Sequence, residues 1–164
     1  MNVFQKCLFA ALLLPAGLLL AQDKRASCDI LKQIDLKPIL GADHDPLSPF
    51  GSKACQAESK AIGRGLVILT VEEGPVADIK KGLTGIRQMN TKERAKEVTV
   101  AAEAELGPEA FSVREKDQRK IAIYAVKGNH AVIVQGMWSI GPTISDAIFG
   151  QLRGVAKEAL AKLP

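Results

Sequence analysis

Residues 120–138 form two runs of alternating apolar and mixed side chains that are separated by a short turn. Both runs are rich in β-branched residues, and Gly128-Asn129 between them suits a two-residue type II′ turn. This turn sets Lys127 opposite His130, so one face of the hairpin is apolar and consists of Ile121, Ile123, Ala125, Val132, Val134 and Trp138. The pattern predicts a β-hairpin that begins an antiparallel sheet.

Strand patterns also occur at residues 53–59, 66–71, 98–102 and 111–114. Apolar residues at helical spacing predict three helices. The first begins at Ser27 or Asp29 and runs to about Leu36; the second begins at Pro75. The last covers residues 143–163, with Thr143 and Asp146 as a capping box.

The predicted order is helix, two strands, helix, three or four strands, helix. Amphipathic helices need an apolar surface to cover, and the apolar face of the hairpin provides one. We therefore predict an α+β fold, with an antiparallel sheet of about five strands and the helices packed on one face of it.

The first residues are typical of a secretory signal peptide. Lys6 precedes an almost wholly apolar run, residues 7–20, and Leu19-Leu20-Ala21 offers a cleavage site. The apolar run is shorter than the roughly 20 residues that a membrane-spanning helix needs. We predict a signal peptide at residues 1–21 and a single domain at residues 22–164. The mature chain is expected to be exported to the periplasm or the medium and to have no membrane span.

The charges of the chain are balanced and interleaved. Its 22 basic and 18 acidic residues give a formal net charge of +4, without a basic cluster. This pattern is typical of a solvated surface, and we expect no nucleic-acid partner.

Two cysteines, Cys28 and Cys55, follow the predicted signal peptide. In an oxidising compartment we expect them to pair as a disulfide. A metal site needs more thiols or histidines nearby, and the sequence offers only His44. We predict no metal and no cofactor.

The triplet Asp43-His44-Asp45, in the Gly- and Pro-rich loop of residues 41–52, has the side chains best suited to binding chemistry. The triplet is a candidate ligand or partner site, although Asp beside Pro is ordinary turn chemistry. A second candidate is an exposed apolar strip on the mixed face of the hairpin, formed by Tyr124, Ile133 and Met137. A helix or a neighbouring strand is an alternative cover for this strip.

No catalytic set is evident, so we assign no catalytic residue and expect no enzyme. The chain lacks a Gly-x-Ser-x-Gly nucleophile motif, and both cysteines are used in the disulfide. The pairs Glu72-Glu73 and Glu103 with Glu105 are the carboxylates that remain for acid–base chemistry.

Four short motifs resemble a family of small exported bacterial proteins. They are Cys28-Asp-Ile-Leu31, Ile39-Leu-Gly41, Cys55 and Glu105-Leu-Gly-Pro-Glu-Ala-Phe111, followed by two strands and a last helix. Many members of that family are cell-wall lipoproteins of unknown function, and their domain is similar to the extracellular sensor domain of a bacterial membrane serine/threonine kinase. The resemblance implies one disulfide, an antiparallel sheet with helices, and no established catalytic residue. This chain differs from the family pattern at Ala57, where an aromatic residue is common, and in lacking a lipid-attachment signal.

The sequence therefore predicts an exported, non-enzymatic binding or sensor-like domain for an extracytoplasmic protein or small ligand. Two other functions stay open. One is an inhibitor of a secreted enzyme that presents the loop Gly41–Ser52. The other is a small hydrolase that uses paired carboxylates.

Overall fold

A computed structural model describes residues 26–60, 65–139 and 143–164. The predicted signal peptide lies outside these residues. None of the helices in the described ranges is both long enough and apolar enough to cross a bilayer.

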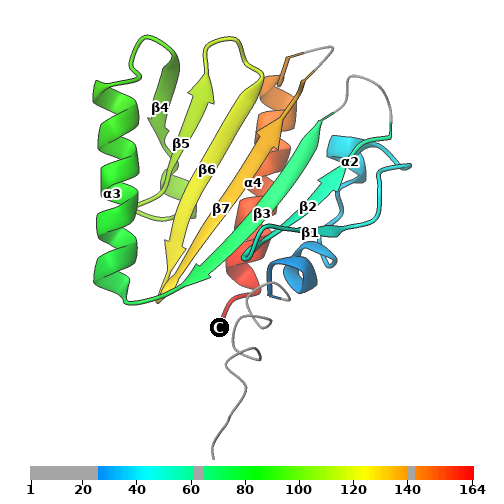
Figure 1. Cartoon of the computed structure of the whole chain (residues 1–164), viewed down its shortest axis with the longest axis horizontal. Coiled ribbons are helices and arrows are strands. Elements are labelled where there is room, and N and C mark those ends of the chain that lie inside the picture. Colours follow the sequence, from blue (N-terminus) through cyan, green and yellow to red (C-terminus); the bar gives the residue numbers. More distant parts are fainter. Residues whose placement is uncertain (1–25, 61–64, 140–142) are drawn as a thin grey trace, which may run out of the picture.

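The described chain is built on one antiparallel sheet of seven strands, in the order β1-β2-β3-β7-β6-β5-β4 (Figure 1). The strands are β1 Ser48–Phe50, β2 Ala54–Glu58, β3 Leu66–Glu73, β4 Val98–Ala102, β5 Phe111–Glu115, β6 Lys120–Lys127 and β7 His130–Met137. The α+β class and the antiparallel sheet are confirmed, but the expected number of about five strands is too low. The strand with no sequence signal is β1, which is short, contains Pro49 and lies in a segment that favours loops.

The central hairpin is confirmed in its register. Lys127 pairs with His130, Ala125 with Val132 and Ile123 with Val134. Gly128 begins the turn with φ +58°, a conformation that residues with a Cβ adopt at a cost. Turn chemistry and side-chain alternation together were sufficient to determine this pairing.

The helix α4, Asp146–Ala161, covers the apolar face of β6 and β7. In Figure 1 it crosses behind the strands. Leu152, Val155 and Ala159 on this helix are almost fully buried in the main core. The predicted cap is wrong by two residues: Ser145, rather than Thr143, accepts a hydrogen bond from the backbone N–H of Ile148 at 3.2 Å.

The helix α3, Val76–Lys92, packs on the opposite face of the sheet. Its apolar residues Ile79, Leu83 and Ile86 join a second core cluster with side chains of β4, β5 and β6: Val98, Val100, Phe111, Val113, Tyr124 and Val126. Figure 1 shows α3 alongside these three strands. The expectation that all helices share one face is therefore wrong. An apolar stripe on a helix predicts that the stripe is buried, but it does not specify on which face of the sheet the helix packs.

The N-terminal segment is two short helices, where the sequence predicted one. Residues 26–31 are helical, and α2 covers Lys37–Leu40, with Pro38 in its first turn and Gly41 at its end. Pro38 therefore begins a new helix, which its fixed φ and missing N–H permit. Both segments pack into the main core beside α4.

The predicted disulfide between Cys28 and Cys55 is present and ties the N-terminal helix to β2. Next to it, the fully buried hydroxyl of Ser27 donates to the carbonyl of Lys53 at 2.6 Å and accepts from the N–H of Val71 at 3.1 Å. Val71 lies one residue past the end of the β2–β3 pairing, so Ser27 satisfies an amide that the sheet leaves without a partner.

Trp138 is buried against backbone at the end of the apolar face. A Cβ at Gly65 would lie 2.4 Å from its ring, and one at Gly136 would lie 2.9 Å from it and 2.7 Å from Leu152. Glycine at these two positions leaves the space that the indole ring occupies. The interpretation of Trp138 as a packing residue follows from these contacts.

Candidate ligand-binding groove

A groove runs along α3 where this helix leaves part of the sheet uncovered. We call it the α3–β7 groove, because α3 forms one wall and the outward residues of β7 lie along its floor. It consists of two hollows that share Ile86, of about 280 Å³ and about 260 Å³. Successive outward residues of β7 pass from one hollow to the other, in the order Ala131, Ile133, Gln135 and Met137. The six steps from Ala131 to Met137 in an antiparallel strand extend about 20 Å, so the groove is elongated.

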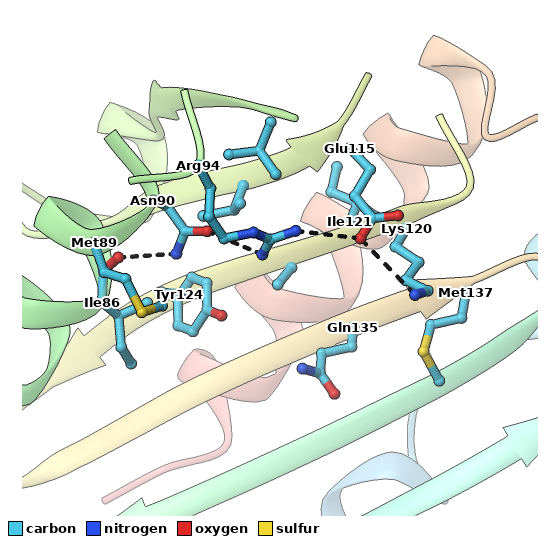
Figure 2. Close-up of a pocket in the computed structure, with 13 residues that line it drawn as sticks. Ile86, Met89, Asn90, Arg94, Glu115, Lys120, Ile121, Tyr124, Gln135 and Met137 are labelled. Carbon is cyan, nitrogen blue, oxygen red and sulfur yellow. Dashed lines mark hydrogen bonds and ion pairs between the residues drawn. The ribbon is translucent and has the colours of Figure 1, made fainter. Parts of the chain in front are cut away.

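Tyr124 is the aromatic residue of the first hollow. Its ring stacks on Phe111, with 4.7 Å between centroids and 16° between planes. Figure 2 shows the ring between Ile86 and Met89 of α3 and Gln135 of β7, with the hydroxyl pointing away from the helix. Within the described part of the chain, no group hydrogen-bonds this hydroxyl or the Gln135 amide. Two half-buried polar groups with no hydrogen-bond partner among the described residues therefore face the hollow beside its apolar side chains.

Burial raises the pKa of Tyr124 above its ordinary value of 10.0, and the nearby Arg94 charge partly offsets this effect. Because Tyr124 is the chain's single tyrosine, tyrosinate absorbance reports on it alone. We expect the native protein to ionise above pH 10, and the denatured protein to ionise near pH 10. Above pH 10 the tyrosine of the unfolded protein ionises more readily than the buried Tyr124. The contribution of Tyr124 to the free energy of unfolding is therefore present below pH 10 and is lost as the pH rises through the folded-state pKa. Identical native and denatured titrations would show that the ring is not buried. The variant Tyr124→Phe, which has no tyrosine, gives the background absorbance to be subtracted.

Charged residues close one end of the first hollow. Arg94 donates to Glu97 at 3.1 Å and to the Asn90 amide oxygen at 3.2 Å. Its second terminal nitrogen lies 3.5 Å from Glu115 Oε1, and Lys120 Nζ lies 3.9 Å from the same oxygen (Figure 2). Glu115 is thus shared by two cations, at distances longer than the roughly 2.8 Å of a strong charge-assisted hydrogen bond.

The opposite end of the groove is acidic. Glu72, Glu73 and Asp78 line the second hollow, and none of them forms an ion pair with a described residue. Glu73 accepts a hydrogen bond from Asn129 at 2.9 Å. The two ends of the groove therefore differ: Arg94 and Lys120 are paired with carboxylates at one end, and the carboxylates at the start of α3 have no ion-pair partner among the described residues.

The structure brings the three predicted strip residues into this groove. Tyr124 and Met137 line the first hollow, and Ile133 lines the second. Sequence reasoning missed Arg94, Glu115 and Lys120, which lie at or just beyond the ends of α3, β5 and β6. Helical spacing from Ile86 through Asn90 to Arg94 was a possible signal, because it places all three on one side of α3 and its end.

The triplet Asp43-His44-Asp45 lies elsewhere. His44 Nδ1 is 2.8 Å from the carbonyl oxygen of Asp45, and the N–H of Asp45 donates to Glu58 at 2.7 Å. His44 lines a hollow with residues 31–37, away from the groove. Among the described residues, no three His, Cys, Asp or Glu side chains are grouped closely enough to hold a metal ion. These contacts are those of a turn joined to β2.

The carboxylates considered for hydrolysis do not converge. Glu103 is buried, and its oxygens accept from Arg153 at 2.6 and 3.2 Å and from Ser112 at 2.7 Å. Glu105 is exposed, and Glu72 and Glu73 point to opposite faces of β3 at its end. Both oxygens of Glu103 are therefore occupied by contacts within the fold.

The described part of the chain is thus an α+β domain, in which an antiparallel sheet has helices on both faces and the two hollows of the α3–β7 groove lie between α3 and the sheet. No family model, no curated protein and no solved structure matches this chain.

Proposed function

We propose that this protein is an exported, non-enzymatic binding or sensor-like domain, and that its ligand occupies the α3–β7 groove. The observation that carries the proposal is the lining of the first hollow. Ile86, Met89 and Met137 give it apolar walls, while the Tyr124 hydroxyl and the Gln135 amide face it without a hydrogen-bond partner in the described part of the chain. Ligand sites combine apolar walls with a few polar groups that fix orientation in this way.

The shape of the groove favours a small, elongated ligand with an apolar body. α3 contacts β7 as well as β4 and β6, and it leaves Ile133, Gln135 and Met137 on this face of β7 half-buried. Met89, with 43% of its surface exposed, borders the opening. Methionine side chains adapt to the shape of apolar ligands, because they are unbranched and polarizable.

Export is supported by the chemistry of the disulfide. Cys28 and Cys55 pair in the structure, and such bonds persist in oxidising compartments outside the cytoplasm. The apolar N-terminal run of the sequence supports the same location.

The test is the binding of a neutral apolar dye, Nile red, to the purified protein. Gly82 lines the second hollow, so Gly82→Leu adds a side chain at the edge of this hollow, and it replaces a helical glycine without loss of helix stability. We expect saturable binding by the wild type and a loss of about tenfold or more in affinity in Gly82→Leu, which corresponds to about 1.4 kcal/mol.

The matched control is Gly150→Leu, which adds the same side chain in open space on α4, on the other face of the sheet. Its dye affinity should equal that of the wild type. Absent dye binding, or an equal loss in both variants, would refute the groove as the ligand site.

A further inference from the structure

We propose that the ligand of the α3–β7 groove is an amphiphile with an oxyanionic head group, and that Glu115 is the built-in counter-ion which this head group displaces. This inference rests on the proposed function, because it names the class of ligand for the same groove.

Hydrogen-bond donors line the first hollow, and the charged ones are grouped at one end. Arg94 and Lys120 lie there, and the Tyr124 hydroxyl and the Gln135 amide face the same hollow (Figure 2). Arginine and lysine only donate hydrogen bonds, and the other two groups each have a donor to offer. A ligand atom that contacts several of these groups must accept hydrogen bonds, as the oxygens of a carboxylate, sulfate or phosphate do.

Glu115 already places an oxyanion at this position. Its Oε1 lies between Arg94 at 3.5 Å and Lys120 at 3.9 Å, and its side chain is 25% exposed. Both contacts are longer than a strong charge-assisted hydrogen bond, so little interaction is lost when another oxyanion replaces this carboxylate. In the absence of ligand, Glu115 is the ion-pair partner of Lys120 and a second partner of Arg94, whose Nε also lies 3.1 Å from Glu97.

The acidic end of the groove determines the orientation of the ligand. Glu72 and Asp78 repel an anion from the second hollow, so the head group is directed to Arg94 and Lys120. The apolar body then extends along Ile86 and Ile133 towards the start of α3. Attraction at one end and repulsion at the other select a single direction of binding.

The experiment compares three amphiphiles with the same alkyl chain as competitors of Nile red, all below the concentration of micelle formation. They are dodecanoate, dodecanol and dodecylammonium, so only the head group differs. We expect dodecanoate to compete about tenfold better than dodecanol, the factor that one charge-assisted contact of about 1.4 kcal/mol supplies. Dodecylammonium should be the weakest competitor.

Two variants assign the effect to the proposed residues. Lys120→Gln should remove most of the preference for dodecanoate, and Glu115→Gln should increase it, because the head group no longer competes with a carboxylate. Lys120 is 60% exposed and has only the 3.9 Å contact, so its replacement leaves the fold intact. Dodecanol serves as the internal control, and its affinity should stay the same in both variants.

The outcomes separate this inference from the proposed function. Equal competition by all three amphiphiles, or a preference for dodecylammonium, would overturn the anionic head group and leave the groove as an apolar site. A preference for dodecanoate that Lys120→Gln and Glu115→Gln leave unchanged would overturn the assigned residues. If neither the dye nor any amphiphile binds, the proposed function itself fails.

Discussion

Reduction of the Cys28–Cys55 disulfide is expected to lower the free energy of unfolding by about 3.5 kcal/mol. The bond closes a loop of 27 residues, and its loss restores the conformational freedom of that loop in the unfolded chain. Reduction also removes the covalent link between the N-terminal helix and β2, next to the buried hydroxyl of Ser27. Urea denaturation with and without reductant, followed by the fluorescence of the single tryptophan, measures the change.

A control for this experiment is the reaction of the unfolded, unreduced protein with a thiol reagent. Neither Cys28 nor Cys55 should react before reduction, and both should react after it. An unchanged urea midpoint in reductant, once both thiols have been shown to be free, would contradict the stabilising role of the bond.

Replacement of Arg153 by methionine is expected to destabilise the fold by about 3 kcal/mol. Arg153 holds both oxygens of Glu103, whose side chain is only 5% exposed, and its guanidinium lies 4.0 Å from the centre of the Phe149 ring. Methionine retains much of the packing on Phe149 but leaves the Glu103 carboxylate buried with Ser112 as its remaining partner. An uncompensated buried charge is among the costliest single changes in a protein.

The double variant Arg153→Met with Glu103→Gln tests this cause. A neutral amide at position 103 needs no cation, so the double variant should recover a large part of the stability lost in Arg153→Met. Thermal or urea unfolding of the wild type, both single variants and the double variant gives the coupling between the two positions. If the two losses simply add, the ion pair is not the source of the effect.

Much of the fold could be predicted because its signals are local. The turn at Gly128-Asn129 and the alternation on each side of it specify the register of β6 and β7. The alternation of apolar and mixed residues also indicated that Tyr124 and Met137 share a face. The single short strand β1 was missed because three residues that include a proline have no periodicity to read.

The side of the sheet occupied by α3 could not be predicted. Ile79, Leu83 and Ile86 indicate one apolar helix face, but the partner surface is formed by strands that follow 20 or more residues later, around Phe111 and Tyr124. Side chains such as Tyr124 can lie in water or under a helix, so their polarity does not determine on which face of the sheet α3 packs.

The charged end of the groove was missed for the same reason. Arg94, Glu115 and Lys120 each lie at the end of an element, where charged residues are ordinarily solvated. Only the pairing of β5 with β6 and the position of α3 bring them to one hollow. The site therefore depends on which strands pair with each other and on where α3 packs. Residue patterns determine strand pairing only within hairpins.

The central claim is that the α3–β7 groove holds a ligand in the cell. The most direct measurement is a native mass spectrum of the protein isolated from its own cell envelope, beside the variant Ala122→Trp. Ala122 lines the first hollow, so an indole at this position fills it. Thr99→Trp, on the exposed face of the edge strand β4, is the control for the added side chain. The account predicts an extra mass on the wild type and on Thr99→Trp that Ala122→Trp lacks. A bare polypeptide mass for the wild type, or the same extra mass on all three proteins, would contradict it.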